Sequence, residues 1–154
     1  MSNPCSSTTE QTHASGATYD PHLILVEDDS IDVEAFKRAL ATRKVSWPVH
    51  VIADGWRALR ALRNPTEEMG SDWIVVLDLN MPLMNGIEFL GEVRSDDKLR
   101  ELDVFVLSTS EDPRDRVGAE LHGVCGCWVK DGTLKTLLEF VDAIVAHCDR
   151  KRGG

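Results

Sequence analysis

Five polar side chains in this sequence have the types and positions needed for phosphoryl chemistry. Glu27 and Asp28 follow one apolar segment, Asp78 follows a second, Thr109 a third and Lys130 a fourth. Clustered carboxylates repel one another, and one of them takes up a proton unless a cation holds them together. Carboxylate oxygens completed by water suit Mg²⁺ better than Zn²⁺. A lysine and a hydroxyl beside such an ion can cradle a phosphoryl group.

The apolar segments that precede these side chains are predicted to be buried parallel strands. Residues 73–77 form an unbroken, largely β-branched run, which is typical of a strand covered on both faces. Similar segments predict strands at residues 22–26, 49–53, 104–107 and 125–129. Helix signals fall between and after them, at residues 30–43, 54–63, 85–94, 112–121 and 133–147.

The alternation of five strands and five helices predicts an α/β fold with a parallel sheet and right-handed crossovers. In open sheets of this kind, ligands bind outside the carboxyl ends of the strands. The five polar side chains all fall at such ends, which is the reason for treating them as one site.

Local signals predict how several helices begin and which faces they bury. Ser30 is expected to cap the first helix, with Ile31 on its inner face, and Trp56 is expected to face inward from the second. Asn85 and Glu88 have the spacing of a capping box. Asp112 before Pro113 is a strong helix start.

Length and charge limit the kinds of protein that this chain can be. Its 154 residues suffice for one domain, and we expect a disordered arm over 1–20, a folded domain over 21–148 and a short basic tail over 149–154. The net charge of −9 argues against nucleic acid as a partner. The sequence has neither an apolar run of about 18 residues for a membrane span nor a secretory signal, so we expect a cytoplasmic protein.

The cysteines and histidines give only weak signals for a metal site or a disulfide. Cys125 and Cys127 are the only close pair among the four cysteines, and we expect them to be small buried residues in a reducing compartment. The five histidines show no spacing typical of metal ligands.

Taken together, these residues make the chain resemble a CheY-like response-regulator receiver domain of two-component signalling, over about residues 21–147. The matching residues are Glu27-Asp28, Asp78 with Met81-Pro82 and Asn85-Gly86, Thr109-Ser110, and Lys130. The resemblance implies a flavodoxin-like fold, a doubly wound five-stranded sheet with strand order 2-1-3-4-5. It implies the following roles: Asp78 as phosphoacceptor, Asp28 as principal Mg²⁺ ligand, Glu27 as a ligand through water, Asn80 as a ligand through its backbone carbonyl, Thr109 as a hydrogen-bond donor to the phosphoryl oxygens, and Lys130 as their ion-pair partner.

Within the family, residues 77–80 and 109–115 are most similar to stand-alone receivers associated with bacterial phytochromes and related sensor kinases. Two positions depart from the family pattern: Asp131 replaces the usual proline, and Cys127 replaces the usual Tyr or Phe. A cis bond before a non-proline residue costs about 2.5–4 kcal/mol, so we expect a trans Lys130–Asp131 bond, with Gly132 at positive φ. Without a ring at position 127, we expect signalling on that face to be weaker or differently routed.

The predicted function is that of a stand-alone response regulator in a two-component system or phosphorelay. Its phosphodonor would be a sensor histidine kinase, with phytochrome-type kinases among the candidates, or a phosphotransfer protein. The output would be phosphorylation-dependent partner binding, without enzymatic action on another substrate, although the protein takes part in its own phosphorylation and dephosphorylation. The oligomeric state is left open, a homodimer included.

Two alternatives belong to other classes. Asp78-Leu79-Asn80 partly matches the D-x-D motif of haloacid-dehalogenase-like phosphatases, but it lacks their second Asp. Turnover of a small phosphate ester would favour that alternative. The other is an interaction module with a receiver fold that is not phosphorylated, against which the full set of acidic, hydroxyl and lysine side chains argues. A flavin or a dinucleotide is disfavoured because the loop after the first strand is not glycine-rich.

Overall fold

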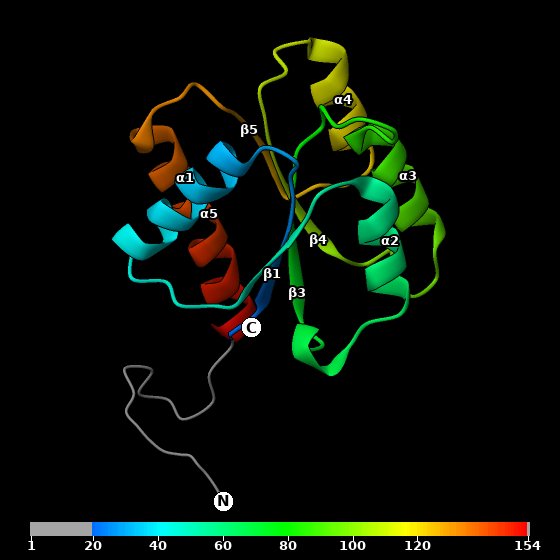
Figure 1. Ribbon diagram of the computed structural model, residues 1–154, viewed down its shortest axis with the longest axis horizontal. Helices are drawn as coiled ribbons and strands as arrows, with labels where there is room; N and C mark the ends of the chain where they lie inside the picture. The colour runs from blue at the N-terminus through cyan, green and yellow to red at the C-terminus, as the bar shows by residue number, and fades with distance from the viewer. Residues whose placement is uncertain (1–19, 154) are drawn as a thin grey trace, which may run out of the picture.

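The computed structural model describes residues 20–153 and forms one parallel sheet between two groups of helices (Figure 1). The arm predicted over 1–20 lies, apart from Asp20, outside the described residues. The strands are β1 (His22–Val26), β2 (Val49–Ile52), β3 (Trp73–Leu77), β4 (Asp103–Ser108) and β5 (Gly126–Val129). The helices are α1 (Ser30–Thr42), α2 (Gly55–Arg63), the 3₁₀ turn η2 (Glu67–Met69), α3 (Gly86–Ser95), α4 (Pro113–Leu121) and α5 (Leu134–Gly153).

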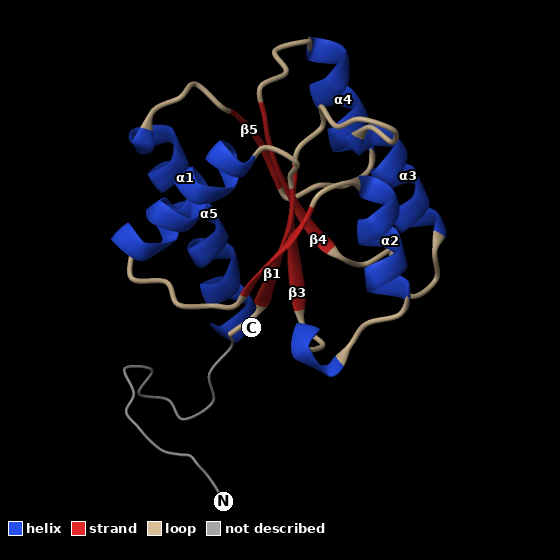
Figure 2. Ribbon diagram, viewed as in Figure 1, coloured by secondary structure: helices blue, strands red, loops and turns tan. Residues whose placement is uncertain are grey.

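The strand order is β2-β1-β3-β4-β5, and all neighbours are parallel. This confirms the predicted α/β class and the flavodoxin-like order 2-1-3-4-5. Helices α1 and α5 cover one face of the sheet, and α2, α3 and α4 cover the other (Figure 2).

Each face of the sheet has its own apolar core. In β3, Ile74 and Val76 pack toward α1 and α5, whereas Val75 and Leu77 pack toward α2, α3 and α4. Because neighbouring residues of a strand point to opposite faces, a strand covered on both sides must be apolar throughout. This is the physical origin of the unbroken run at residues 73–77.

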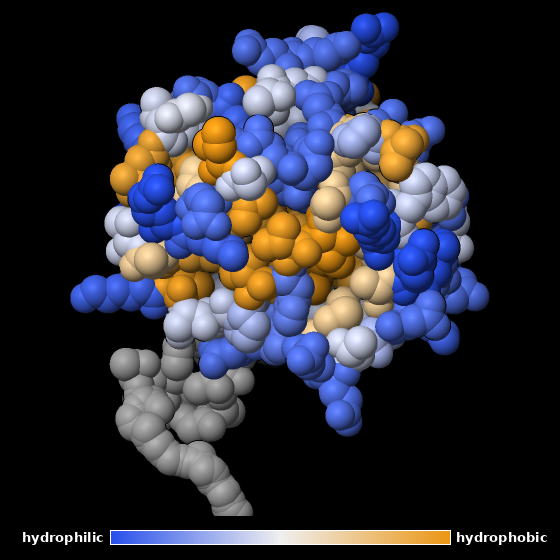
Figure 3. Space-filling view, in the orientation of Figure 1, coloured by the Kyte–Doolittle hydropathy of each residue, from blue (hydrophilic) through white to orange (hydrophobic). Residues whose placement is uncertain are grey.

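The edge of the sheet reaches the surface at β2. Figure 3 shows an apolar area between the two groups of helices, where this edge strand runs, and Val51 is 42% exposed there. The strand has four residues, and short edge strands limit pairing with other chains. Among the described residues, no helix is both long and apolar enough to cross a membrane.

Most helix starts match their predicted signals, with one correction. The capping box of Asn85 and Glu88 is present, and Asp54 and Asp112 cap α2 and α4. The predicted cap at Ser30 is wrong. Asp29 caps α1, because its side chain accepts a hydrogen bond from the backbone N–H of Ile31, and Ser30 is the first helical residue.

Two large apolar side chains predicted to face inward are exposed instead. Ile31 is 76% exposed, because the buried face of α1 is centred on Val33 and Phe36, nearly opposite to it on the helix. Trp56 is 54% exposed, because the buried face of α2 lies about a third of a turn away from it around the helix. That face is formed by Ala58, Leu59 and Leu62.

The C-terminal helix is longer than predicted. It runs to Gly153 instead of about His147, so the predicted basic tail at 149–154 begins inside the helix. The extra turns are attached to the sheet, because Cys148 is buried and Lys151 pairs with Asp103 in β4.

The prediction that both close cysteines are buried is wrong for Cys125. The pairing of β5 with β4 begins at Gly126, so Cys125 lies just outside the strand and is exposed. Cys127 is partly buried and packs against the core on the side of α2, α3 and α4.

Candidate functional site

Three of the predicted carboxylates meet at the carboxyl ends of β1 and β3. One ligand atom each from Glu27, Asp28 and Asp78 lies within 4.8 Å of the others. Glu27 and Asp78 are buried, whereas Asp28 is exposed. Three oxygen ligands on one open side suit Mg²⁺, which keeps several waters and demands few protein ligands.

The register of the sheet brings these residues together. Val26 pairs with Leu77, so the strands end side by side and their next residues, Glu27 and Asp78, are neighbours. The backbone N–H of Asp78 donates to the carbonyl of Val26 at 3.2 Å. The carboxylate of Asp78 accepts a hydrogen bond from the backbone N–H of Asn80 at 3.0 Å, which orients it.

The loop after β3 depends on a glycine. A Cβ atom on Gly86 would lie 2.6 Å from the Cα atom of Leu79, closer than real contacts allow. The backbone N–H of Gly86 also donates to the carbonyl of Leu79. The loop therefore folds back tightly behind Asp78, and any side chain at position 86 would push it away.

Lys130 enters the site from the end of β5. Its Nζ atom lies 2.5 Å from Oε1 of Glu27, 2.9 Å from Oδ2 of Asp32 and 3.8 Å from Oδ2 of Asp78, and its side chain is 10% exposed. A hydrogen bond from its backbone N–H to the carbonyl of Ser108 continues the pairing of β4 and β5.

Asp32 belongs to the site and was not among the predicted residues. It lies in the first turn of α1, and its carboxylate accepts a hydrogen bond from Lys130. The signal in the sequence was its position one turn after Asp28 and Asp29, because the first turn of a helix that follows a strand lies close to the strand's carboxyl end.

The electrostatics of the site favour an added cation. Burial raises the pKa of Glu27 to about 7, and the negative charge of Asp78 adds to this, although Lys130 acts in the opposite direction. Burial alone would lower the pKa of Lys130, but its hydrogen bonds to Glu27 and Asp32 raise it. The single ammonium of Lys130 lies near three carboxylates and cannot neutralise all of them. The site therefore keeps excess negative charge that a divalent ion would neutralise.

Thr109 reaches the site through Asn80. Thr109 follows β4 and is exposed, and its hydroxyl accepts a hydrogen bond from the side-chain amide of Asn80 at 3.1 Å. The next residue, Ser110, donates to the carboxylate of Asp115 in α4. The strand end is therefore connected to α4 by side-chain hydrogen bonds.

The start of α5 confirms the expectations for Asp131 and Gly132. The Lys130–Asp131 bond is trans, and Gly132 has a φ of +81°. The carboxylate of Asp131 accepts hydrogen bonds from the backbone and hydroxyl of Thr133 and from the hydroxyl of Thr136. Asp131 thus orders the first turn of α5 with an acceptor that proline does not have. The expected effect of Cys127 on signalling stays a prediction.

A cavity of ≈160 Å³ extends from the site between α1 and α5. Asp78, Lys130 and Asp32 line its polar end, and Phe36 and Leu137 line its apolar end. Lys130 therefore has open space on one side.

This arrangement can support nucleophilic attack by a carboxylate on phosphorus. Asp78 is the buried carboxylate at the end of the central strand, and Lys130 is a cation within 4 Å of it. The neighbouring carboxylates can hold a metal ion beside it. Charge that develops on phosphoryl oxygens would thus meet fixed positive partners.

Known proteins share both the sequence pattern and the fold. Residues 23–142 match the family model described as the response regulator receiver domain. The response regulator Rcp1 of Synechocystis sp. is 31% identical over 125 residues, which cover 79% of this chain and 84% of Rcp1. The crystal structure of the phosphorylated cyanobacterial phytochrome response regulator RcpA superposes with a TM-score of 0.71 at 32% identity, covering 82% of this chain and 91% of RcpA. The Mn²⁺-bound form of Rcp1 has a TM-score of 0.69 at 28% identity, covering 80% of this chain and 91% of that structure.

Proposed function

Because the chain belongs to the response regulator receiver domain family, we propose that it accepts a phosphoryl group on Asp78 from a sensor histidine kinase or a phosphotransfer protein. The family resemblance is confirmed, as is the likeness to phytochrome response regulators. The phosphorylated protein would then signal by binding a partner, because the phosphoryl group stabilises one of two conformations through its contacts.

One observation carries this proposal. Asp78 is buried at the end of the central strand, with ligand atoms of Glu27 and Asp28 within 4.8 Å and the ammonium of Lys130 at 3.8 Å. In the reaction, a carboxylate oxygen of Asp78 attacks phosphorus and forms an acyl phosphate. The P–N bond of the phosphohistidine breaks, and the leaving imidazole keeps the electron pair and takes a proton from solvent.

The residues around Asp78 fit a divalent cation. Glu27, Asp28 and Asp78, with the backbone carbonyl of Asn80, would hold Mg²⁺, which would neutralise charge on the phosphoryl oxygens. The Mn²⁺-bound form of Rcp1 supports a divalent site in this family.

Lys130 and Thr109 would hold the transferred group. The ammonium of Lys130 would turn from Glu27 toward a phosphoryl oxygen, and the hydroxyl of Thr109 would donate to another after leaving Asn80. These residues would also influence hydrolysis of the acyl phosphate. The protein is thus a phosphoacceptor and not an enzyme with a separate substrate.

The likeness to RcpA supports a phytochrome-type kinase as one candidate phosphodonor. The net charge of −9 argues against nucleic acid as the output partner. We also propose a cytoplasmic location, and the oligomeric state, a homodimer included, stays open.

Labelling with a small acyl phosphate and Mg²⁺ tests the assignment. Intact-mass measurement should show one phosphoryl group on the wild type, none on Asp78→Asn and none after chelation. Asp29→Asn is the matched control, because asparagine also caps helices and the control should label like the wild type. Labelling of Asp78→Asn at the wild-type rate would refute the assignment.

The same assay separates the alternatives. An interaction module that is not phosphorylated would leave the wild type unlabelled, both by the acyl phosphate and by purified candidate kinases. A phosphatase of the haloacid-dehalogenase type would release phosphate from a small phosphate ester with many turnovers. We expect neither result.

A further inference from the structure

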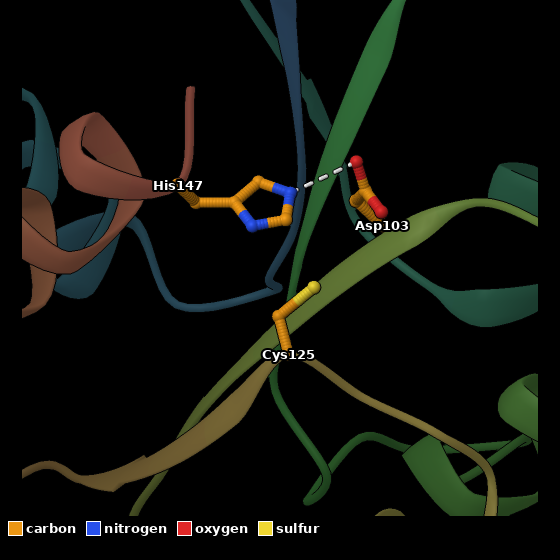
Figure 4. A group of neighbouring side chains, drawn as sticks. All are labelled: Asp103, Cys125 and His147. Atoms are coloured by element: carbon orange, nitrogen blue, oxygen red, sulfur yellow. Dashed lines mark hydrogen bonds and ion pairs between the residues drawn. The ribbon is translucent and has the colours of Figure 1, made fainter. Parts of the chain in front are cut away.

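A second group of side chains that could hold a metal ion, Asp103, Cys125 and His147, lies close together (Figure 4). Asp103 is the first residue of β4, Cys125 directly precedes β5, and His147 lies in α5. One ligand atom of each lies within 4.8 Å of the others. The length of β4, about 17 Å at a strand's rise per residue, separates this group from the Asp78 site.

An ion-pair network explains part of this group. His147 Nε2 lies 3.1 Å from Oδ2 of Asp103, and Lys151 Nζ lies 2.8 Å from the same oxygen. These contacts attach α5 to β4. They need no thiol, yet the Sγ atom of Cys125 points toward the space between the other two side chains (Figure 4).

Neighbouring residues hold the ring of His147 and the backbone of Cys125 in place. The ring of His147 packs edge-on against Phe105, with 5.4 Å between ring centroids and an interplanar angle of 81°. The backbone N–H of Cys125 donates to the carbonyl of Val104 at 2.7 Å. Asp103 and His147 lie on a strand and a helix, and ligands on such rigid elements are held more precisely than ligands on loops.

Arg94 fixes the loop that leads to Cys125. Its guanidinium donates to the carbonyl oxygens of His122 at 2.6 Å and Gly123 at 3.3 Å. The same group also donates to the carbonyls of Arg100 and Leu102, just before β4. One side chain therefore sets the relative positions of the segments that carry Asp103 and Cys125.

We infer that Asp103, Cys125 and His147 form a site for a borderline transition-metal ion such as Zn²⁺. A thiolate, an imidazole and a carboxylate are the three kinds of ligand that Zn²⁺ takes, and water would complete the tetrahedron. The all-oxygen site around Asp78 suits Mg²⁺ instead, so donor type separates the two ions.

Binding at this site exchanges protons for metal. The thiol of Cys125 releases its proton to solvent, and His147 binds as the neutral imidazole. Lys151 is the cation with which the metal ion competes for Asp103, which limits the affinity. The bound ion would join the C-terminal half of α5 to β4 and β5 and would stabilise the folded state by mass action.

Metal titration of the full chain tests this inference. Zn²⁺ and Co²⁺ are added with excess Mg²⁺ present, so that the carboxylates at the Asp78 site are occupied. We expect one equivalent to bind, with the absorption of a cobalt–thiolate bond. Cys125→Ser should remove that absorption, and both Cys125→Ser and His147→Gln should weaken binding about tenfold or more.

Two control variants change residues of the same type nearby. Cys127→Ser alters the other cysteine of this segment, and His122→Gln alters a histidine outside the group. Both should bind like the wild type. Cobalt–thiolate absorption that persists in Cys125→Ser, or that never forms in the wild type, would overturn the inference.

A measurement on the wild type alone tests the site without relying on variants that could misfold. Alkylation followed by peptide mapping reports the reactivity of each cysteine with and without Zn²⁺. Selective protection of Cys125 supports the site. Equal alkylation of Cys125 in the presence and absence of Zn²⁺ refutes it.

Discussion

The ammonium nitrogen of Lys130 lies 2.5 Å from Oε1 of Glu27, closer than to any oxygen of Asp78, whose Oδ2 is 3.8 Å away. The lysine therefore neutralises a residue that we assign to the metal site. A divalent ion and Lys130 would compete for the same negative charge, and phosphorylation would require Lys130 to move.

Removal of this lysine should strengthen metal binding while it slows phosphorylation. We expect Lys130→Met to bind Mg²⁺ about tenfold more tightly, because a positive charge a few ångströms away no longer repels the ion. Calorimetry gives the affinity, and acyl-phosphate labelling gives the rate. Lys135→Met, which removes an exposed lysine of α5, is the control and should change neither. Unchanged affinity in Lys130→Met would contradict the proposed competition.

Asp28 should be the carboxylate on which metal affinity most depends. Asp28→Ala is expected to lower Mg²⁺ affinity about tenfold or more, because few protein ligands share the ion and waters supply the rest. Asp29→Asn removes a charge one residue away and should lower the affinity much less. Calorimetry on both variants makes the comparison. Equal affinities for Asp28→Ala and the wild type would exclude Asp28 as a ligand.

Arg94 is only partly exposed and should matter for stability more than most charged side chains do. We expect Arg94→Lys to lower the free energy of unfolding by about 1.5–3 kcal/mol, because a single ammonium lacks the guanidinium's spread of donors to four carbonyl oxygens. Urea unfolding measures the difference. Arg100→Lys, which changes a side chain that forms a 3.8 Å ion pair with the exposed Asp97, should stay within about 0.5 kcal/mol of the wild type. Similar decreases in unfolding free energy for Arg94→Lys and Arg100→Lys would argue against a special role of Arg94.

Asp131 should contribute stability that depends on pH. Hydrogen bonds from the side chains of Thr133 and Thr136 lower the pKa of Asp131 to about 2, from an ordinary value of 3.8. Its ionised form thus favours the folded state above pH 3.8, and this contribution is lost as the pH falls toward 2. The stability difference between wild type and Asp131→Ala should therefore be constant near neutral pH and shrink below pH 4.

The control for that experiment is Asp97→Ala, since the Asp97 side chain is 95% exposed. Urea unfolding at several pH values gives the difference in unfolding free energy between the wild type and each variant. A difference for Asp131→Ala that grows as the pH falls would have the wrong sign for this explanation.

Local patterns in the sequence were sufficient for the α/β class and for grouping most of the Asp78 site, whereas the strand order 2-1-3-4-5 came from the family resemblance. Apolar runs such as residues 73–77 indicate strands covered on both faces, and helix signals between them leave a parallel sheet as the main solution. Once the sheet is parallel, the residue after each strand must lie at one edge, which is why Glu27, Asp78 and Lys130 could be grouped in advance. Capping signals such as Asn85 with Glu88 are local too, and the structure retains them.

Tertiary packing decided everything that depends on contacts between distant segments. The choice of Glu27 and Asp32 as partners of Lys130 depends on how α1 and β5 approach each other, and no sequence spacing encodes it. The exposure of Trp56 depends on which side of α2 the sheet covers. The meeting of Asp103, Cys125 and His147 has the same origin. Hydrogen-bond and apolar patterns act over a few residues, whereas the geometry of such groups is set by the register of strands and the docking of helices.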